Sequence, residues 1–173
     1  MSAGPEVDSP RIDAPEIDLR IRDPRLREWG FPRWGSAAAA GLDLHACLDE
    51  PLILKAQAPA ILIPAGFSVL IGDPDWCGLI FPRSGLGHRD GLVLGNGVGV
   101  IDADYEGPLM ISAWNRNADP AATIEIRPGD RIAQLVFTRV TRPAFTIVDA
   151  LDPEEPAPQS GRGQGGFGST GRR

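Results

Sequence analysis

Three acidic side chains close a glycine-rich stretch in the middle of the chain and are the first candidates for chemistry. The stretch GNGVGVIDADYEGP spans residues 95–108 and ends on Asp102, Asp104 and Glu106. Val and Ile favour a pleated strand, whereas repeated glycines mark a bend, a bulge or a close approach to the backbone. We therefore expect a tight hairpin that ends in carboxylates and against which a ligand could lie. An ordinary hairpin with a solvated acidic tip is the alternative.

Arg83 and Ser84 stand in a second polar turn, PRSG at 82–85, directly after an apolar stretch. Backbone amide dipoles that converge on one concavity can hold an anion, and a guanidinium adds a fork of donors. The turn is therefore a candidate anion cradle. A polar surface turn with Arg83 in an ion pair is the alternative.

A third polar stretch, RPGDRIAQLVF at 127–137, combines a turn with a strand. Pro128-Gly129 fits a type II turn, and Asp130 with Arg131 is as compatible with a structural ion pair as with a ligand contact. Gln134 interrupts an otherwise apolar run, so its amide must be hydrogen-bonded if it is buried.

The last twelve residues, RGQGGFGSTGRR at 162–173, have the composition of a flexible tail. Phe167 stands between glycines and could stack on a ligand, while Arg162, Ser169 and Thr170 could close on phosphate. An RGG-type RNA-binding segment is the alternative.

Short strands must position these groups. Apolar runs between residues 52 and 82 are separated by turn residues at roughly 8 to 12 residue spacing, which is typical of an all-β sandwich or barrel. No βαβ alternation is visible, and residues 83–90 suit a single helical turn. Further strands are expected at 17–21, 41–46, 92–94, 98–101, 109–114, 122–126, 132–139 and 145–148.

Composition limits the class of protein. The 173 residues suit one folded unit, and 38 of them are glycine or proline (21 + 17), so long helices are not expected. The net charge of −6 argues against a protein that mainly grips nucleic-acid backbone, although focused arginines could still bind a small anion.

Cys47 and Cys77 are expected to be buried free thiols, because the chain has no CxxC motif or Cys/His cluster. His45 and His88 are too scattered for a zinc site. Residues 1–16 are polar and proline-rich, which predicts a disordered leader. Neither a signal peptide nor a long apolar run is present, so a cytoplasmic protein without membrane contact is expected.

Five stretches together resemble the trimeric dUTP diphosphatases (dUTPases). They are AGLDLHA at 40–46, PRSGLG at 82–87, GNGVGVIDADYEGPL at 95–109, RPGDRIAQLVF at 127–137 and RGQGGFGSTG at 162–171. Each match alone is weak, but five in the family's order and spacing are very specific. The resemblance runs from about Ile17 to the C-terminus.

The resemblance implies a distorted jelly-roll-like (β-clip) domain over residues 17–150 and a flexible tail over 151–173 that carries the closing motif. It implies a homotrimer with active sites at the subunit interfaces. The expected reaction is hydrolysis of dUTP to dUMP and diphosphate with Mg²⁺, which keeps uracil out of DNA and supplies dUMP for thymidylate synthesis.

The resemblance also assigns roles to residues. Asp102 matches the acid that orients and deprotonates the attacking water, and Asp43 matches the acid that reaches the metal through coordinated water. Tyr105 matches the aromatic that packs under the deoxyribose and leaves no room for a 2′-hydroxyl. The matching substrate contacts are Asn96, Gly97, Val98, Gly99, Val100, Ile101 and Met110 around the nucleoside, Arg83, Ser84, Gly85 and Gln134 at the triphosphate, and Arg162, Phe167, Ser169 and Thr170 in the closing tail.

One departure and two rivals accompany this assignment. Gln164 stands where family members often carry Glu, which should alter tail electrostatics only slightly. The nearer rival is dCTP deaminase, but Ser112 occupies the place of that family's catalytic glutamate. The distant rival is a non-enzymatic β domain with a nucleic-acid-binding tail, against which the net negative charge and the single RGQGG unit count.

Overall fold

The computed structural model describes residues 14–148, and its secondary structure is nearly all β, as expected. The chain divides into two compact units, Met1–Thr141 and Arg142–Arg173. In the described part of the first unit the helical elements are one short helix, α1, and one π-helical turn, η1, and neither is long or apolar enough to cross a membrane. The elements are β1 (Asp18–Ile21), α1 (Arg25–Glu28), β2 (Leu42–His45), β3 (Leu52–Lys55), β4 (Ile61–Pro64), β5 (Phe67–Leu70), β6 (Trp76–Pro82), η1 (Leu86–Asp90), β7 (Leu92–Leu94), β8 (Gly99–Ile101), β9 (Met110–Asn115), β10 (Thr123–Ile126) and β11 (Arg131–Arg139).

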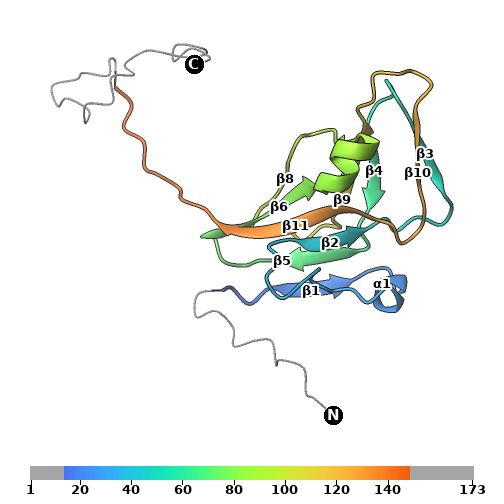
Figure 1. Cartoon of the computed structure of the whole chain (residues 1–173). Helices are drawn as coiled ribbons and strands as arrows, with labels where there is room; N and C mark the ends of the chain where they lie inside the picture. Colours follow the sequence, from blue (N-terminus) through green and yellow to red (C-terminus); the bar gives the residue numbers. More distant parts are fainter. Residues whose placement is uncertain (1–13, 149–173) are drawn as a thin grey trace. The chain divides into compact units, whose positions relative to one another are not determined.

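Four small antiparallel sheets enclose one apolar core. Strand β11 runs through the four-stranded sheet β2-β11-β6-β8, between β2 and β6 (Figure 1). The other sheets are β4-β9-β7 and the pairs β1-β5 and β10-β3. Apolar residues of the strands turn inward, which stabilises the domain by removing apolar surface from water. The most completely buried side chains include Leu44, Ile63, Phe67, Leu109, Ile111 and Leu135.

The prediction of a hairpin at residues 95–101 is wrong about which strands pair. Strand β7 pairs with β9, and β8 pairs with β6, so the strands on either side of the turn belong to different sheets. The turn is closed by the Gly97 N–H, which donates to the Leu94 carbonyl oxygen at 3.1 Å. The segment is therefore a corner at which the chain passes from one sheet to another.

The strand predicted at residues 145–148 is also absent. Phe145 and Ile147 alternate with Thr146 as in a half-buried strand, but their exposed fractions are 86% and 97%. A strand needs a neighbour for its backbone groups, and the described residues of the second unit provide none. The single helical turn predicted at 83–90 is confirmed by η1.

Both cysteines are buried and free, as predicted. The Cys47 Sγ lies against Gly66, whose φ of +81° favours glycine and where a Cβ would overlap the sulfur. Burial and the neighbouring Asp23 raise the pKa of the Cys47 thiol to about 12. The thiol is therefore protonated at neutral pH and packs as a small apolar group.

Candidate active site

Asp43, on β2, pairs with two arginines from distant parts of the chain. Arg83 Nε lies 3.1 Å from Oδ1, and Arg131 Nη1 lies 3.0 Å from Oδ2. Arg83 Nη1 also donates to the Arg131 carbonyl oxygen at 2.9 Å, which ties the Arg83 guanidinium to the backbone of β11. The side chains of Arg83 and Arg131 remain 32% and 52% exposed. The cluster has a net positive charge and retains donors that an anion could reach.

A β-bulge places Arg131 on the same face of the sheet as Asp43. Gln134 lies directly opposite Asp43, and Arg131 lies directly opposite His45, with a register shift between Arg131 and Ala133. Asp43 and His45 are two residues apart and so share a face, whereas residues 131 and 134 of a regular strand would point to opposite faces. The bulge adds one residue and brings Arg131 back to the Asp43 side.

Gln134 connects this cluster to the segment that carries Arg83. Its Nε2 donates to the Pro82 carbonyl oxygen at 3.1 Å, so the expectation that this amide is hydrogen-bonded is confirmed. Its Oε1 would lie 2.5 Å from a Cβ at Gly41, so any larger residue at Gly41 would displace the amide. Ser84 and Gly85, which follow Arg83, are exposed. Three of the matched stretches therefore meet at one end of the four-stranded sheet.

The turn at residues 127–130, directly before β11, positions the start of the strand that carries Arg131. The Asp130 N–H donates to the Arg127 carbonyl oxygen at 3.0 Å, and Gly129 has a φ of +83°, which confirms the type II turn. Asp130 Oδ2 accepts a hydrogen bond from the Arg127 N–H at 2.8 Å, while Arg131 pairs with Asp43. Trp29 packs on the Gly129 backbone, where a Cβ would be 3.0 Å from the indole.

His45 is the buried titratable group of this face. Its exposed fraction is 7%, and its Nδ1 has no hydrogen-bond partner among the described residues. The ring packs between Trp29 and Phe31, at centroid distances of 5.8 and 6.2 Å. Burial, and then the Arg131 charge, lower the pKa of His45. A neutral His45 leaves the positive charge of the face to the arginines.

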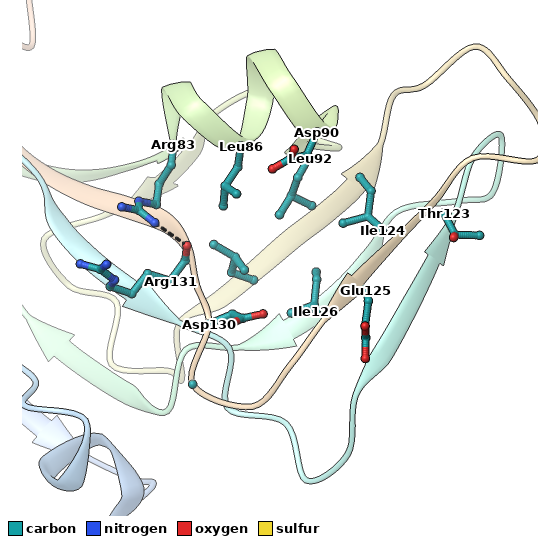
Figure 2. A pocket seen from close by; sticks show the side chains of 12 residues that line it. Arg83, Leu86, Asp90, Leu92, Thr123, Ile124, Glu125, Ile126, Asp130 and Arg131 are labelled. Atoms are coloured by element: carbon teal, nitrogen blue, oxygen red, sulfur yellow. Dashed lines mark hydrogen bonds between the residues drawn. The ribbon is translucent and has the colours of Figure 1, made fainter.

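A pocket of about 620 Å³ opens beside Arg83 and Arg131. Figure 2 shows the two arginines on one side of it and the apolar side chains of Leu86, Leu92 and Ile124 along its wall. Of the predicted site residues that the structure describes, Arg83 alone lines this pocket. The pocket by itself therefore does not bring the predicted nucleotide contacts together.

The three positions 95, 97 and 99 favour glycine for different structural reasons. A Cβ at Gly95 would overlap the Ala60 side chain, and a Cβ at Gly99 would lie 3.2 Å from Ile80 Cβ. Gly97 instead has a φ of +72°, which favours glycine, and no atom lies within 4 Å of its ideal Cβ. A ligand could therefore approach the backbone at Gly97, whereas the other two glycines pack against the protein.

The remaining predicted contacts of this segment are mostly open to solvent. Asn96 and Asp102 are exposed, and Val98 and Val100 have exposed fractions of 40% and 60%. Ile101 is buried and pairs with Gly78, while Met110 is half-buried. The tail residues Arg162, Phe167, Ser169 and Thr170, with Gln164, lie outside the described residues.

Asp102 is far from the arginine cluster within one chain. Because Ile101 pairs with Gly78, Asp102 follows at the Cys77 end of β6, and its charge, after burial, raises the pKa of the Cys77 thiol. Arg83 follows the other end of the same strand. Arg83 is six positions after Cys77 along this extended segment, which corresponds to about 20 Å.

The side chains around Asp43 can be compared with the known kinds of metal site. Among the described residues, no group of three or more His, Cys, Asp or Glu side chains could hold a metal ion. Mg²⁺ commonly keeps several waters and binds through one or two carboxylates together with substrate phosphates. Asp43 offers one carboxylate beside cations suited to phosphate. The residues present are therefore compatible with Mg²⁺ brought in part by a substrate.

Sequence comparison places this architecture in a known family. The dUTPase family model matches residues 27–171, and the chain belongs to the dUTPase family. The deoxyuridine 5′-triphosphate nucleotidohydrolase of Tolumonas auensis is 54% identical over 134 residues, covering 78% of this chain and 82% of that protein. The corresponding protein of Xanthomonas campestris pv. campestris is 53% identical over 136 residues, covering 79% and 83%.

Solved structures with the same fold include two phage enzymes. A mutant of the Staphylococcus bacteriophage 80alpha dUTPase with dUpNHpp superposes with a TM-score of 0.75 at 25% identity, covering 90% of this chain and 98% of that chain. A mutant dUTPase from phage phi11 of S. aureus, described for its coordination of a structural Mg(II) ion, gives a TM-score of 0.66 at 25% identity and covers 78% and 97%. The distorted jelly-roll-like fold expected from the sequence is confirmed.

Proposed function

We propose that this protein hydrolyses dUTP to dUMP and diphosphate. One observation supports the proposal more than any other: Arg83 and Arg131, 48 residues apart, converge on Asp43 in a member of the dUTPase family. Phosphoryl transfer depends mainly on positioning and on neutralising charge, which this cluster can supply. The reaction would supply dUMP for thymidylate synthesis and, by removing dUTP, keep uracil out of DNA. It would take place in the cytoplasm, without a nucleic-acid or membrane partner.

In the proposed reaction, Asp102 accepts a proton from the attacking water as the new P–O bond forms. The phosphoanhydride bond between the α- and β-phosphates breaks, and diphosphate leaves with the bonding pair. Mg²⁺, when bound with the substrate, would neutralise the triphosphate charge. Arg83 would hold the triphosphate with Ser84, Gly85 and Gln134, and Asp43 would orient the ion through coordinated water.

Selectivity is proposed to come from the 95–101 turn and Tyr105. The backbone of Gly97 to Val100, with Asn96, would pair with the uracil edge, and a bound cytosine would cover these groups and leave them unpaired. The open space beside Gly97 supports this placement. Ile101 and Met110 would complete the nucleoside contacts, and the Tyr105 ring would exclude a 2′-hydroxyl.

The separation of Asp102 from Arg83 supports a site shared between subunits. A water activated by Asp102 must lie beside the phosphates that Arg83 holds, yet the two residues flank opposite ends of β6, about 20 Å apart. We therefore propose that one copy supplies the 95–105 segment and a second copy supplies the arginine cluster. A homotrimer with three such interfaces satisfies this requirement by cyclic symmetry.

Residues 1–16 are proposed to be a leader before the β domain of residues 17–150, and residues 151–173 are proposed to be a flexible tail. Residues 1–13 and 149–173 lie outside the described residues. Within that tail, Arg162, Phe167, Ser169 and Thr170 would close over a site formed by the other two subunits, as a lid.

A nucleotide panel tests the proposed function. The protein is incubated with dUTP, dCTP, dTTP and UTP at fixed Mg²⁺, and diphosphate and ammonia are both followed. Diphosphate from dUTP alone is expected. Ammonia from dCTP would favour the deaminase rival, although Ser112, on β9, provides no carboxylate there. Hydrolysis of UTP at the dUTP rate would refute the proposed selectivity.

A further inference from the structure

Tyr105 is held by the segment that follows it. Its hydroxyl donates to the Pro108 carbonyl oxygen at 3.0 Å, and a Cβ at Gly107 would overlap the hydroxyl and the ring. The side chain is still 40% exposed. The orientation of this ring therefore depends on where the backbone of residues 107–108 lies.

A buried hydroxyl fixes that backbone. Ser68, on β5, has an exposed fraction of 5%, and its Oγ donates to the Gly107 carbonyl oxygen at 2.8 Å. The neighbouring Phe67 carbonyl oxygen accepts a hydrogen bond from the Leu109 N–H at 3.0 Å. The Tyr105 segment is thus attached to β5 by one side-chain and one backbone hydrogen bond.

Arg22 completes this connection from the end of β1. Its Nε donates to Ser68 Oγ at 2.6 Å, and its Nη2 lies 3.4 Å from the Glu106 carbonyl oxygen. Because Ser68 Oγ accepts the hydrogen bond from Arg22, the hydroxyl proton of Ser68 is donated to the Gly107 carbonyl oxygen. A charged donor also strengthens such a chain of hydrogen bonds.

We propose that Arg22, acting through Ser68, is a positioning residue that holds the Tyr105 ring in the orientation that excludes ribonucleotides. The inference rests on the proposed function, because it deepens the role of Tyr105 there. Arg22 itself need not contact the substrate. Its loss should relax the segment 105–108 and leave the fold of the domain in place.

A spectroscopic test needs no activity, because Tyr105 is the only tyrosine of the chain. Full-length protein labelled with 3-fluorotyrosine gives one ¹⁹F resonance. Arg22→Ala should shift or broaden it, and Ser68→Ala should do the same. Arg27→Ala is the matched control: Arg27, on α1, is also exposed, with no side-chain hydrogen bond or ion pair in the described part of the chain, and it should leave the resonance unchanged.

A kinetic test measures the ratio of kcat/KM for dUTP to kcat/KM for UTP. A hydrophobic pocket rejects an added hydroxyl by only about 10², so a displaced Tyr105 ring in Arg22→Ala should lower the ratio by roughly tenfold. In a Tyr105→Ala background the same substitution should no longer change the ratio, since coupled residues are not additive. A loss of stability alone would lower both activities together and leave the ratio unchanged.

The outcomes separate this inference from the proposed function. An active wild-type enzyme whose ratio and ¹⁹F resonance are the same in Arg22→Ala overturns the positioning role alone. A wild-type protein that hydrolyses no nucleotide overturns the proposed function and the selectivity role, while the ¹⁹F comparison still decides whether Arg22 positions Tyr105. If Arg22→Ala does not fold, Ser68→Ala decides the same question.

Discussion

Asp102 and Arg83 flank opposite ends of the same strand, β6, within one chain. An active site that uses both must therefore draw them from different copies. Two inactive variants, Asp102→Asn and Arg83→Ala, should recover activity when they are unfolded and refolded together. Random mixing in a cyclic trimer leaves one intact interface in each mixed assembly, so about a quarter of wild-type activity is expected.

The control for this experiment is to mix the two folded variants without refolding, which should give little recovery. Absence of recovery after co-refolding, with mixed assemblies demonstrated by differently tagged chains, would contradict the shared site.

Asp102→Asn should bind substrate but not turn it over. The amide keeps the size of the side chain and loses the base, so turnover of dUTP should fall by at least about 10²-fold. Binding of a non-hydrolysable dUTP analogue, measured by calorimetry, should remain close to that of the wild type. Asp104→Asn is the control and should keep most of the turnover. Near wild-type turnover in Asp102→Asn would remove Asp102 from its role.

Arg131 should matter for activity although it was not among the predicted site residues. Arg131→Ala removes a guanidinium that contacts Asp43 at 3.0 Å, and we expect kcat/KM for dUTP to fall by about tenfold or more. Arg127→Ala is a matched control, because Arg127 pairs with Glu125 on the surface, where ion pairs contribute little. Equal activities of the two variants would show that Arg131 is not part of the site.

Protonation of Asp23 at low pH should lower the free energy of unfolding of the domain. Arg25 Nη2 lies 2.6 Å from Asp23 Oδ2, and this hydrogen bond holds the pKa of Asp23 below its usual value of 3.8. A carboxyl whose pKa is lowered by folding stabilises the fold above pH 3.8, and that contribution is lost as the pH falls through the lowered pKa. The difference in urea midpoint between wild type and Asp23→Asn should be large at pH 7 and shrink below pH 3.8.

Asp49→Asn provides the comparison for this titration. Asp49 contacts the same Arg25 at 3.1 Å, but its side chain is 94% exposed. Its substitution should change the midpoint little at any pH. If Asp49→Asn and Asp23→Asn behave alike, then burial of the Asp23 pair is not what stabilises this corner.

The sequence predicted the strands better than it predicted their partners. Period-2 alternation identifies the buried face of a strand, which is why β1 and β2 lie where they are expected. Alternation does not state which strand lies alongside. The turn at 95–98 was therefore interpreted as a hairpin, although its two strands pair in different sheets.

At the site, too, the sequence pattern does not state which distant residues lie together. Asp43, Arg83 and Gln134 were identified from motifs, and the structure brings them together at one end of a sheet. Arg131 stood next to Asp130 in the sequence and was assigned no definite partner, because its partner Asp43 lies 88 positions away. A possible signal was the apolar pair Ile132-Ala133, since two consecutive buried residues interrupt the alternation at a bulge.

The bulge in β11 makes the length of this segment as important as its composition. If one residue were deleted between Gly129 and Gln134, the motif would keep nearly all its residue types, but Arg131 would turn to the opposite face from Asp43. A substitution at Ile132 would change packing, whereas its deletion would remove a charge from the site. Single-residue insertions and deletions should therefore be tolerated worse here than point substitutions, a pattern that a deletion scan of residues 129–134 would show.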